Sequence, residues 1–223
     1  MSLLKNLSVA LLLLLPATLQ AAEEFITLDD NIEIKVFVFH PEEAGSGPWP
    51  LAVLMSGGRG NEYVARAQFW LGRELARRGW TIAVPVSPNR TYFSGEGGRR
   101  IPAVIARLQD SPSIKEGRAL LVGVSSGGTE AIEVAARHPV TFLGVMAVPG
   151  RLRDDTDLSP LAGMPIYLRI GSKDNFKWDK RFNDMVARLE ASGALVNAKL
   201  VPDARHVFEL NWDELESWLN TLK

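Results

Sequence analysis

Residues 119–128 read ALLVGVSSGG, and this stretch decides both the fold and the candidate chemistry. The apolar run Ala119–Val124 has the length of a buried strand, and the stretch Thr129–Arg137 behind it has a helical pattern. Between them, residues 123–127 match the pattern G-x-S-x-G, which holds a serine exposed on a strained strand-to-helix turn. Side chains at the two glycine positions would collide with the neighbouring strand and helix. We therefore predict that Ser125 is a nucleophile; a glycine-rich turn without chemistry is the alternative.

The rest of the chain alternates short apolar runs with helical periodicity. Continuous apolar runs indicate strands that are covered on both faces, as in a parallel sheet. The predicted strands are 51–55, 80–86, 119–124, 142–148, 165–170 and 194–201, and the predicted helices are 64–75, 101–108, 129–137, 182–189 and 212–222. Ahead of these, the runs 25–28 and 32–39 flank turn-forming residues and predict an antiparallel hairpin. The pattern predicts one α/β domain, a three-layer α/β/α sandwich around a mostly parallel central sheet.

A serine becomes a good nucleophile only when a base removes its proton. The chain has three histidines, and His206 lies in the loop between the last predicted strand and the last predicted helix. His40 and His138 each precede a proline at the end of an element, and we expect them to cap that element or to lie on the surface. His206 is therefore the predicted base; a solvated loop histidine is the alternative.

The imidazole in turn needs a carboxylate that fixes its tautomer. Asp174 follows the predicted strand 165–170, at the sheet edge where parallel strands deliver their loops. Two competitors fit less well, because Asp203 is too close to His206 in sequence and Asp179 falls at or in the following helix. We predict Asp174 as the acid, against the alternative of a surface carboxylate paired with a neighbouring lysine.

Acyl chemistry at a serine also needs two backbone N–H groups that point at the developing oxyanion. The amide of Ser126, next to the candidate nucleophile, is one of them. The other is expected from the loop after the first parallel strand, residues 56–60 with the sequence SGGRG, because glycines let the backbone approach a ligand closely. We predict the amide of Gly58 first and that of Arg59 second.

With these features the chain resembles the α/β-hydrolase-fold family over essentially its whole length behind the N-terminal segment. The elbow 123–127, the order Ser125, Asp174, His206 and the glycine loop at 56–60 all fall where that family has them. The compact size is similar to dienelactone-hydrolase-like and small carboxylesterase-like members. The resemblance implies a sheet of about eight strands, cleavage of ester or thioester bonds through an acyl-enzyme, and neither cofactor nor metal. One departure is Ser56-Gly57, where many relatives have His-Gly.

The loops predict an open site for a small acyl substrate. Only residues 150–164 separate two predicted strands where many relatives insert a lid, too few for a helical cap. Arg59, Tyr92 and Phe176 lie in loops that should face the site, and we predict that they contact the substrate; ordinary surface residues are the alternative. A serine peptidase, an acyltransferase or a non-catalytic binding protein of the same fold stay open as alternative functions.

Composition narrows the function classes further. The chain has 25 basic and 26 acidic residues without a block of like charges, so nothing indicates nucleic-acid binding. It has no cysteine, which excludes disulfides, thiolate metal sites and a cysteine nucleophile. Residues 1–22 join a basic residue, an apolar run and small residues, which predicts an export signal ahead of a domain at 23–223. We therefore expect a periplasmic or secreted protein without a stable membrane anchor after cleavage; the sequence leaves the oligomeric state open.

Overall fold

The computed structural model describes residues 21–41, 47–87, 93 and 95–222 of the chain. The predicted export signal lies almost wholly outside the described residues, and so does Tyr92. Among the described residues, no helix has the length and apolarity needed to cross a membrane.

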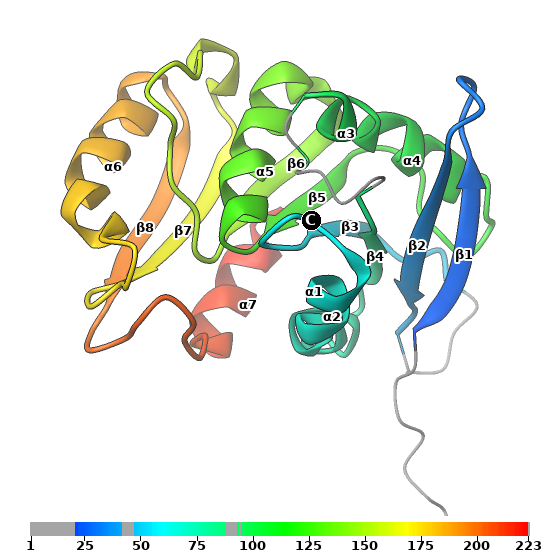
Figure 1. The fold of residues 1–223 in the computed structure, drawn as a ribbon, viewed down its shortest axis with the longest axis horizontal. Coiled ribbons are helices and arrows are strands. Elements are labelled where there is room, and N and C mark those ends of the chain that lie inside the picture. The colour runs from blue at the N-terminus through cyan, green and yellow to red at the C-terminus, as the bar shows by residue number, and fades with distance from the viewer. Residues whose placement is uncertain (1–20, 42–46, 88–92, 94, 223) are drawn as a thin grey trace, which may run out of the picture.

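Eight strands form a single sheet (Figure 1) in the order β1-β2-β4-β3-β5-β6-β7-β8. The strands are β1 (Ala22–Thr27), β2 (Glu33–Phe39), β3 (Leu51–Met55), β4 (Thr81–Pro85), β5 (Ala119–Gly123), β6 (Phe142–Ala147), β7 (Pro165–Gly171) and β8 (Leu195–Val201). β2 pairs antiparallel with both β1 and β4, and every other neighbouring pair is parallel. The predicted mostly parallel sheet with an antiparallel N-terminal hairpin is confirmed.

Helices cover both faces of this sheet. They are α1 (Glu62–Ala67), α2 (Phe69–Ala76), α3 (Glu96–Arg99), α4 (Ile101–Leu108), α5 (Ser126–Arg137), α6 (Phe182–Ala191) and α7 (Trp212–Asn220), with short 3-10 turns η2 (Pro139–Thr141), η3 (Ser159–Leu161) and η4 (Trp178–Arg181). The apolar sides of α4, α5 and α6 pack on one face, and those of α1, α2 and α7 pack on the other (Figure 1). The three-layer sandwich is therefore confirmed.

The central strands are buried on both faces, as their continuous apolar runs indicate. Along β3, Leu51, Val53 and Met55 face the α5 side, while Ala52 and Leu54 face the α2 side. β8 differs from the prediction: it is the last strand of the sheet, and its residues are half-buried or exposed. An apolar run marks a strand but does not reveal that the strand has a neighbour on one side only.

Two further details differ from the sequence prediction. The single helix expected over 64–75 is two helices, α1 and α2, which meet at Gln68. The backbone leaves helical geometry there, and the Gln68 side chain accepts a hydrogen bond from the Gly57 amide at 3.0 Å. β1 begins three residues before the predicted run, because Ala22 and Glu24 pair with Val38 and Val36 although neither is a strong strand former.

Candidate active site

Ser125 lies on the turn between β5 and α5 in a conformation that few non-glycine residues adopt. Its φ is 58° and its ψ is −121°, and its amide donates to the Pro149 carbonyl at 2.8 Å. The flanking glycines are needed for space: a Cβ on Gly123 would lie 2.2 Å from the Gly127 carbonyl oxygen, and one on Gly127 would lie 2.1 Å from the Met55 carbonyl oxygen. Strained backbone of this kind persists only where the surrounding packing holds it.

The side chains of Ser125, His206 and Asp174 form one chain of hydrogen bonds. Ser125 Oγ lies 2.8 Å from His206 Nε2, and His206 Nδ1 lies 2.6 Å from Asp174 Oδ2. The carboxylate is buried, and its other oxygen accepts from the Phe176 amide at 2.7 Å. With both oxygens engaged, the carboxylate is oriented to receive Nδ1–H and leave Nε2 facing the serine, which assigns the tautomer.

The backbone itself holds the histidine loop against the loop that carries the acid. The Lys173 amide donates to the Ala204 carbonyl at 2.8 Å, and the Asp203 amide donates to Ser172 Oγ at 2.9 Å. A Cβ on Gly171 would lie 2.0 Å from the Arg205 carbonyl oxygen, so only glycine fits where the two loops touch.

The competing residues lie apart from this chain of hydrogen bonds. Asp203 is exposed and pairs with Lys173 at 2.6 Å, which lowers the pKa of the Asp203 carboxyl. Asp179 belongs to η4, directly before α6. His138 caps the C-terminal end of α5, and His40 lies 6.2 Å from Trp49 between ring centroids.

The glycine loop at 56–60 lies against the elbow. Ser126 Oγ donates to the Gly58 carbonyl at 2.7 Å, which ties the two predicted oxyanion donors to each other. Among the described residues, the amides of Gly58 and Ser126 have no protein acceptor, whereas the Gly57 amide donates a hydrogen bond to the Gln68 side chain. The Arg59 amide has no protein acceptor among these residues either, so the amides of Ser126, Gly58 and Arg59 are all available to a bound oxygen.

A pocket of about 220 Å³ opens at the candidate nucleophile. Its lining combines polar, cationic and aromatic side chains: Ser125, Ser126, Thr129, Arg151, Arg153, Phe176 and Trp178. Of the predicted substrate contacts, Phe176 lines this pocket with its ring 4.5 Å from that of His206, whereas Arg59 is exposed and does not line it.

Two arginines of this pocket were not predicted from the sequence. Arg151 and Arg153 follow β6, so they reach the same sheet edge by the rule that placed Asp174 there. Arg151 lies 6.0 Å from the Trp178 ring centroid. Arg153 pairs with Glu133 on α5 at 3.0 Å, and burial nevertheless raises the pKa of the Glu133 carboxyl.

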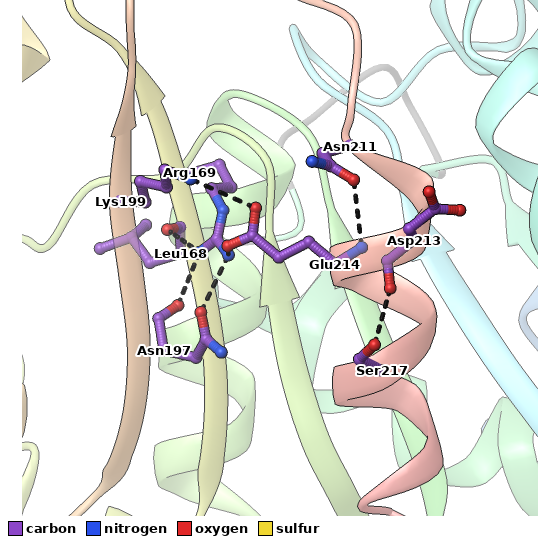
Figure 2. A network of polar contacts seen from close by, with 8 residues as sticks. All are labelled: Leu168, Arg169, Asn197, Lys199, Asn211, Asp213, Glu214 and Ser217. Carbon is purple, nitrogen blue, oxygen red and sulfur yellow. Dashed lines mark hydrogen bonds and ion pairs between the residues drawn. The ribbon is translucent and has the colours of Figure 1, made fainter.

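A buried polar network fixes the other end of the histidine loop (Figure 2). Arg169 on β7 donates a hydrogen bond to Glu214 Oε1 on α7 at 2.7 Å. It also donates to the side-chain oxygen and to the carbonyl of Asn197 on β8, each at 2.9 Å. The Asn211 side chain caps α7 by accepting from the Glu214 amide at 3.1 Å. The start of α7 is thus anchored to the sheet a few residues after His206.

Neither a lid nor a metal cluster accompanies these groups in the described parts of the chain. The connection 148–164 between β6 and β7, which the structure describes in full, holds only the turn η3, so the predicted absence of a helical cap there is confirmed. Within the described ranges, three or more His, Asp or Glu side chains nowhere gather as metal ligands do.

This fold and this arrangement of groups define an α/β-hydrolase, and solved structures agree on the fold. An esterase of Pyrococcus furiosus matches with a TM-score of 0.71 at 15% identity, over 91% of this chain and 93% of that one. Esterase 2 of Thermogutta terrifontis, phosphorylated by paraoxon, matches with a TM-score of 0.64 at 13% identity, over 91% of this chain and 92% of that one. A thermostable esterase matches with a TM-score of 0.64 at 17% identity over 91% of this chain, which spans only 60% of the esterase.

Residues 87–217, more than half of the chain, match the dienelactone hydrolase family. The chain therefore belongs to the dienelactone hydrolase family. Membership supports a hydrolase that acts on ester bonds. No curated protein matches the chain in sequence.

Proposed function

We propose that this protein cleaves carboxylic ester or thioester bonds through a Ser125–His206–Asp174 triad and an acyl-enzyme intermediate. The observation that carries the proposal is the continuous run of hydrogen bonds from Ser125 Oγ through His206 to the buried Asp174. The strained serine at its end and the membership of the dienelactone hydrolase family support it further.

The first half-reaction acylates the serine. Ser125 Oγ attacks the carbonyl carbon while His206 Nε2 takes the hydroxyl proton, and Asp174 stabilises the imidazolium that forms. The amides of Gly58 and Ser126 hold the negative charge on the carbonyl oxygen. The bond to the leaving oxygen then breaks, and Nε2 returns its proton to that oxygen, which releases the alcohol.

The second half-reaction repeats these steps with water. His206 Nε2 takes a proton from a water molecule that attacks the acyl carbon, and the same two amides hold the second oxyanion. Collapse of this intermediate breaks the bond to Ser125 Oγ, which recovers a proton from Nε2. The products are a carboxylic acid and the free enzyme.

The test combines turnover with covalent labelling. Ser125→Ala and His206→Ala should each lower kcat on a p-nitrophenyl ester by about 1,000-fold or more, and the double variant should be scarcely worse because the groups act as a unit. Asp174→Asn should retain more activity than either. The exposed Ser217→Ala on α7 is the matched control and should keep full activity.

An organophosphate such as paraoxon should label Ser125 in equal amount with the protein, as read by mass spectrometry of peptides. Label on Ser126, or undiminished activity in Ser125→Ala, would overturn the proposal. Faster turnover of aminoacyl anilides than of esters would assign the same residues to a peptidase instead.

A further inference from the structure

A second groove, of about 440 Å³, lies between α2 and the segment that follows His206. Its lining is Trp70, Arg73, Glu74, Arg77, Val207, Phe208, Glu209 and Trp212. We refer to it as the Trp70 groove. It lies on the α2 and α7 side of the sheet, whereas the pocket with Arg151 is lined from the α5 and α6 side.

Four apolar side chains line this groove beside four charged ones, and two of the apolar ones are exposed. Val207 is 75% exposed and Trp70 is 37% exposed, while Phe208 and Trp212 are partly buried against the core. The acidic Glu74 on the rim pairs with both Arg77 and Arg78 of its own segment. Large apolar side chains left in water around a hollow mark a binding surface.

Both walls of the Trp70 groove begin at groups of the candidate active site. On one side, Val207 directly follows His206. On the other side, Trp70 is two residues beyond Gln68, whose side chain accepts the hydrogen bond from Gly57 in the glycine loop. The two walls of the groove therefore adjoin, along the chain, the predicted base and the residue that holds the glycine loop, and the ester carbonyl has to lie between that base and that loop.

We propose that the Trp70 groove binds an extended apolar group of the ester substrate, so that the enzyme selects esters with a long alkyl or aryl substituent over short ones. This inference rests on the proposed function, because it needs the ester to react at Ser125. The occupant is apolar because Trp70, Val207, Phe208 and Trp212 form the apolar part of both walls, and Glu74 is already paired with Arg77 and Arg78. The other charged side chains of the lining, Arg73 and Glu209, are at exposed positions and can stay in water.

The expected effect follows from the transfer of methylene groups out of water. Burying one methylene completely strengthens binding by a factor of about four, and an open groove that covers half of the methylene strengthens it by a factor of about two. Four additional methylenes on the substituent that the groove holds should then raise kcat/KM by roughly 16-fold. Trp70 provides one wall, and Trp70→Ala should reduce this ratio to roughly fourfold.

The experiment measures kcat/KM for two substrate series, one with a fixed alcohol and growing acyl chain and one with a fixed acyl group and growing alcohol. Trp70→Ala and the more conservative Val207→Ser, at a mainly exposed position, should both flatten the dependence on chain length in one of the series. Phe25→Ala, an exposed aromatic on the remote edge strand β1, is the control and should leave both dependences unchanged (Figure 1).

Unchanged chain-length dependence in both series, with both variants folded, would overturn the proposal. The same holds if Trp70→Ala only turns a dimer into a monomer in sedimentation, because the groove would then be an interface between copies. Neither result affects the proposed function as long as Ser125→Ala is inactive. Failure of the groove proposal can therefore be distinguished from failure of the proposed function.

Discussion

Replacing Arg169 by methionine tests whether the buried network of Figure 2 stabilises the protein. The Arg169 side chain is only 3% exposed, and its guanidinium lies 3.6 Å from the centroid of the Tyr167 ring. It donates to the Leu168 carbonyl, to both oxygens of Asn197 and to Glu214. Methionine fills a similar volume but donates to none of these acceptors.

The magnitude follows from what the substitution leaves behind. Breaking a buried ion pair by removing one partner costs about 3–5 kcal/mol, mostly because the remaining charge is left uncompensated. Glu214 keeps 32% of its side chain in water, so its carboxylate remains partly hydrated. We therefore expect Arg169→Met to lower the free energy of unfolding by about 3 kcal/mol, at the low end of that range.

Two further variants separate the ion pair from packing. Glu214→Gln keeps an oxygen acceptor but leaves the arginine charge without its counter-ion, so a loss of about 2 kcal/mol is expected. The double variant with methionine at both positions should lose less than the sum of the single losses, because neither charge is then left alone.

Urea denaturation followed by circular dichroism at neutral pH measures these differences. Lys199→Met is the control, since Lys199 is 56% exposed and lies 3.5 Å from the other Glu214 oxygen. Exposed pairs contribute little, so its effect should stay within about 0.5 kcal/mol. A loss below about 1 kcal/mol in Arg169→Met would refute the reasoning, because the network would then not offset the cost of burying the charge.

Three further outcomes follow from the structure. Gly127→Ala should cost about 3 kcal/mol or more in urea unfolding, because its Cβ would lie 2.1 Å from the Met55 carbonyl oxygen; an unchanged midpoint would contradict this. Burial raises the pKa of the Glu133 carboxyl in the folded protein. The contribution of this carboxyl to the free energy of unfolding is therefore fully present below its ordinary pKa of 4.5 and is lost as the pH rises through the pKa of the folded state. Relative to wild type, Glu133→Gln should therefore gain stability as the pH rises above 4.5, unlike the exposed Glu190→Gln, and a constant difference would count against it. If residues 1–22 are an export signal, the intact mass of the exported protein should lack about 21 or 22 residues, whereas a full-length exported chain would disprove the signal.

Local patterns in the sequence were enough for most of the fold. Each strand from β2 to β8 lies within a residue of its predicted range, since a buried strand needs a continuous apolar run and a turn former at its end. The turn at Ser125 could also be predicted from the sequence, because the requirement for glycine on both sides is a property of the local backbone. The positions of Asp174 and His206 followed from the rule that parallel strands deliver their loops to one edge.

What the sequence did not reveal depends on contacts between distant parts of the chain. Arg169 and Glu214 are 45 residues apart, and no local pattern predicts that they pair. The residues around Gln68 likewise do not predict that the helix is interrupted there and that the Gln68 side chain accepts a hydrogen bond from the Gly57 amide. These partners become visible only when the sheet order brings their loops together.

The segment between β8 and α7, which carries His206, is held at both of its ends. Its start is packed against Gly171, and its end is fastened through the first turn of α7 to Arg169. In protein engineering, the length of this segment should therefore be kept, whereas residue types at its exposed positions can be varied. Side chains such as Val207 can be exchanged in a library, whereas an inserted or deleted residue would move the base away from the serine.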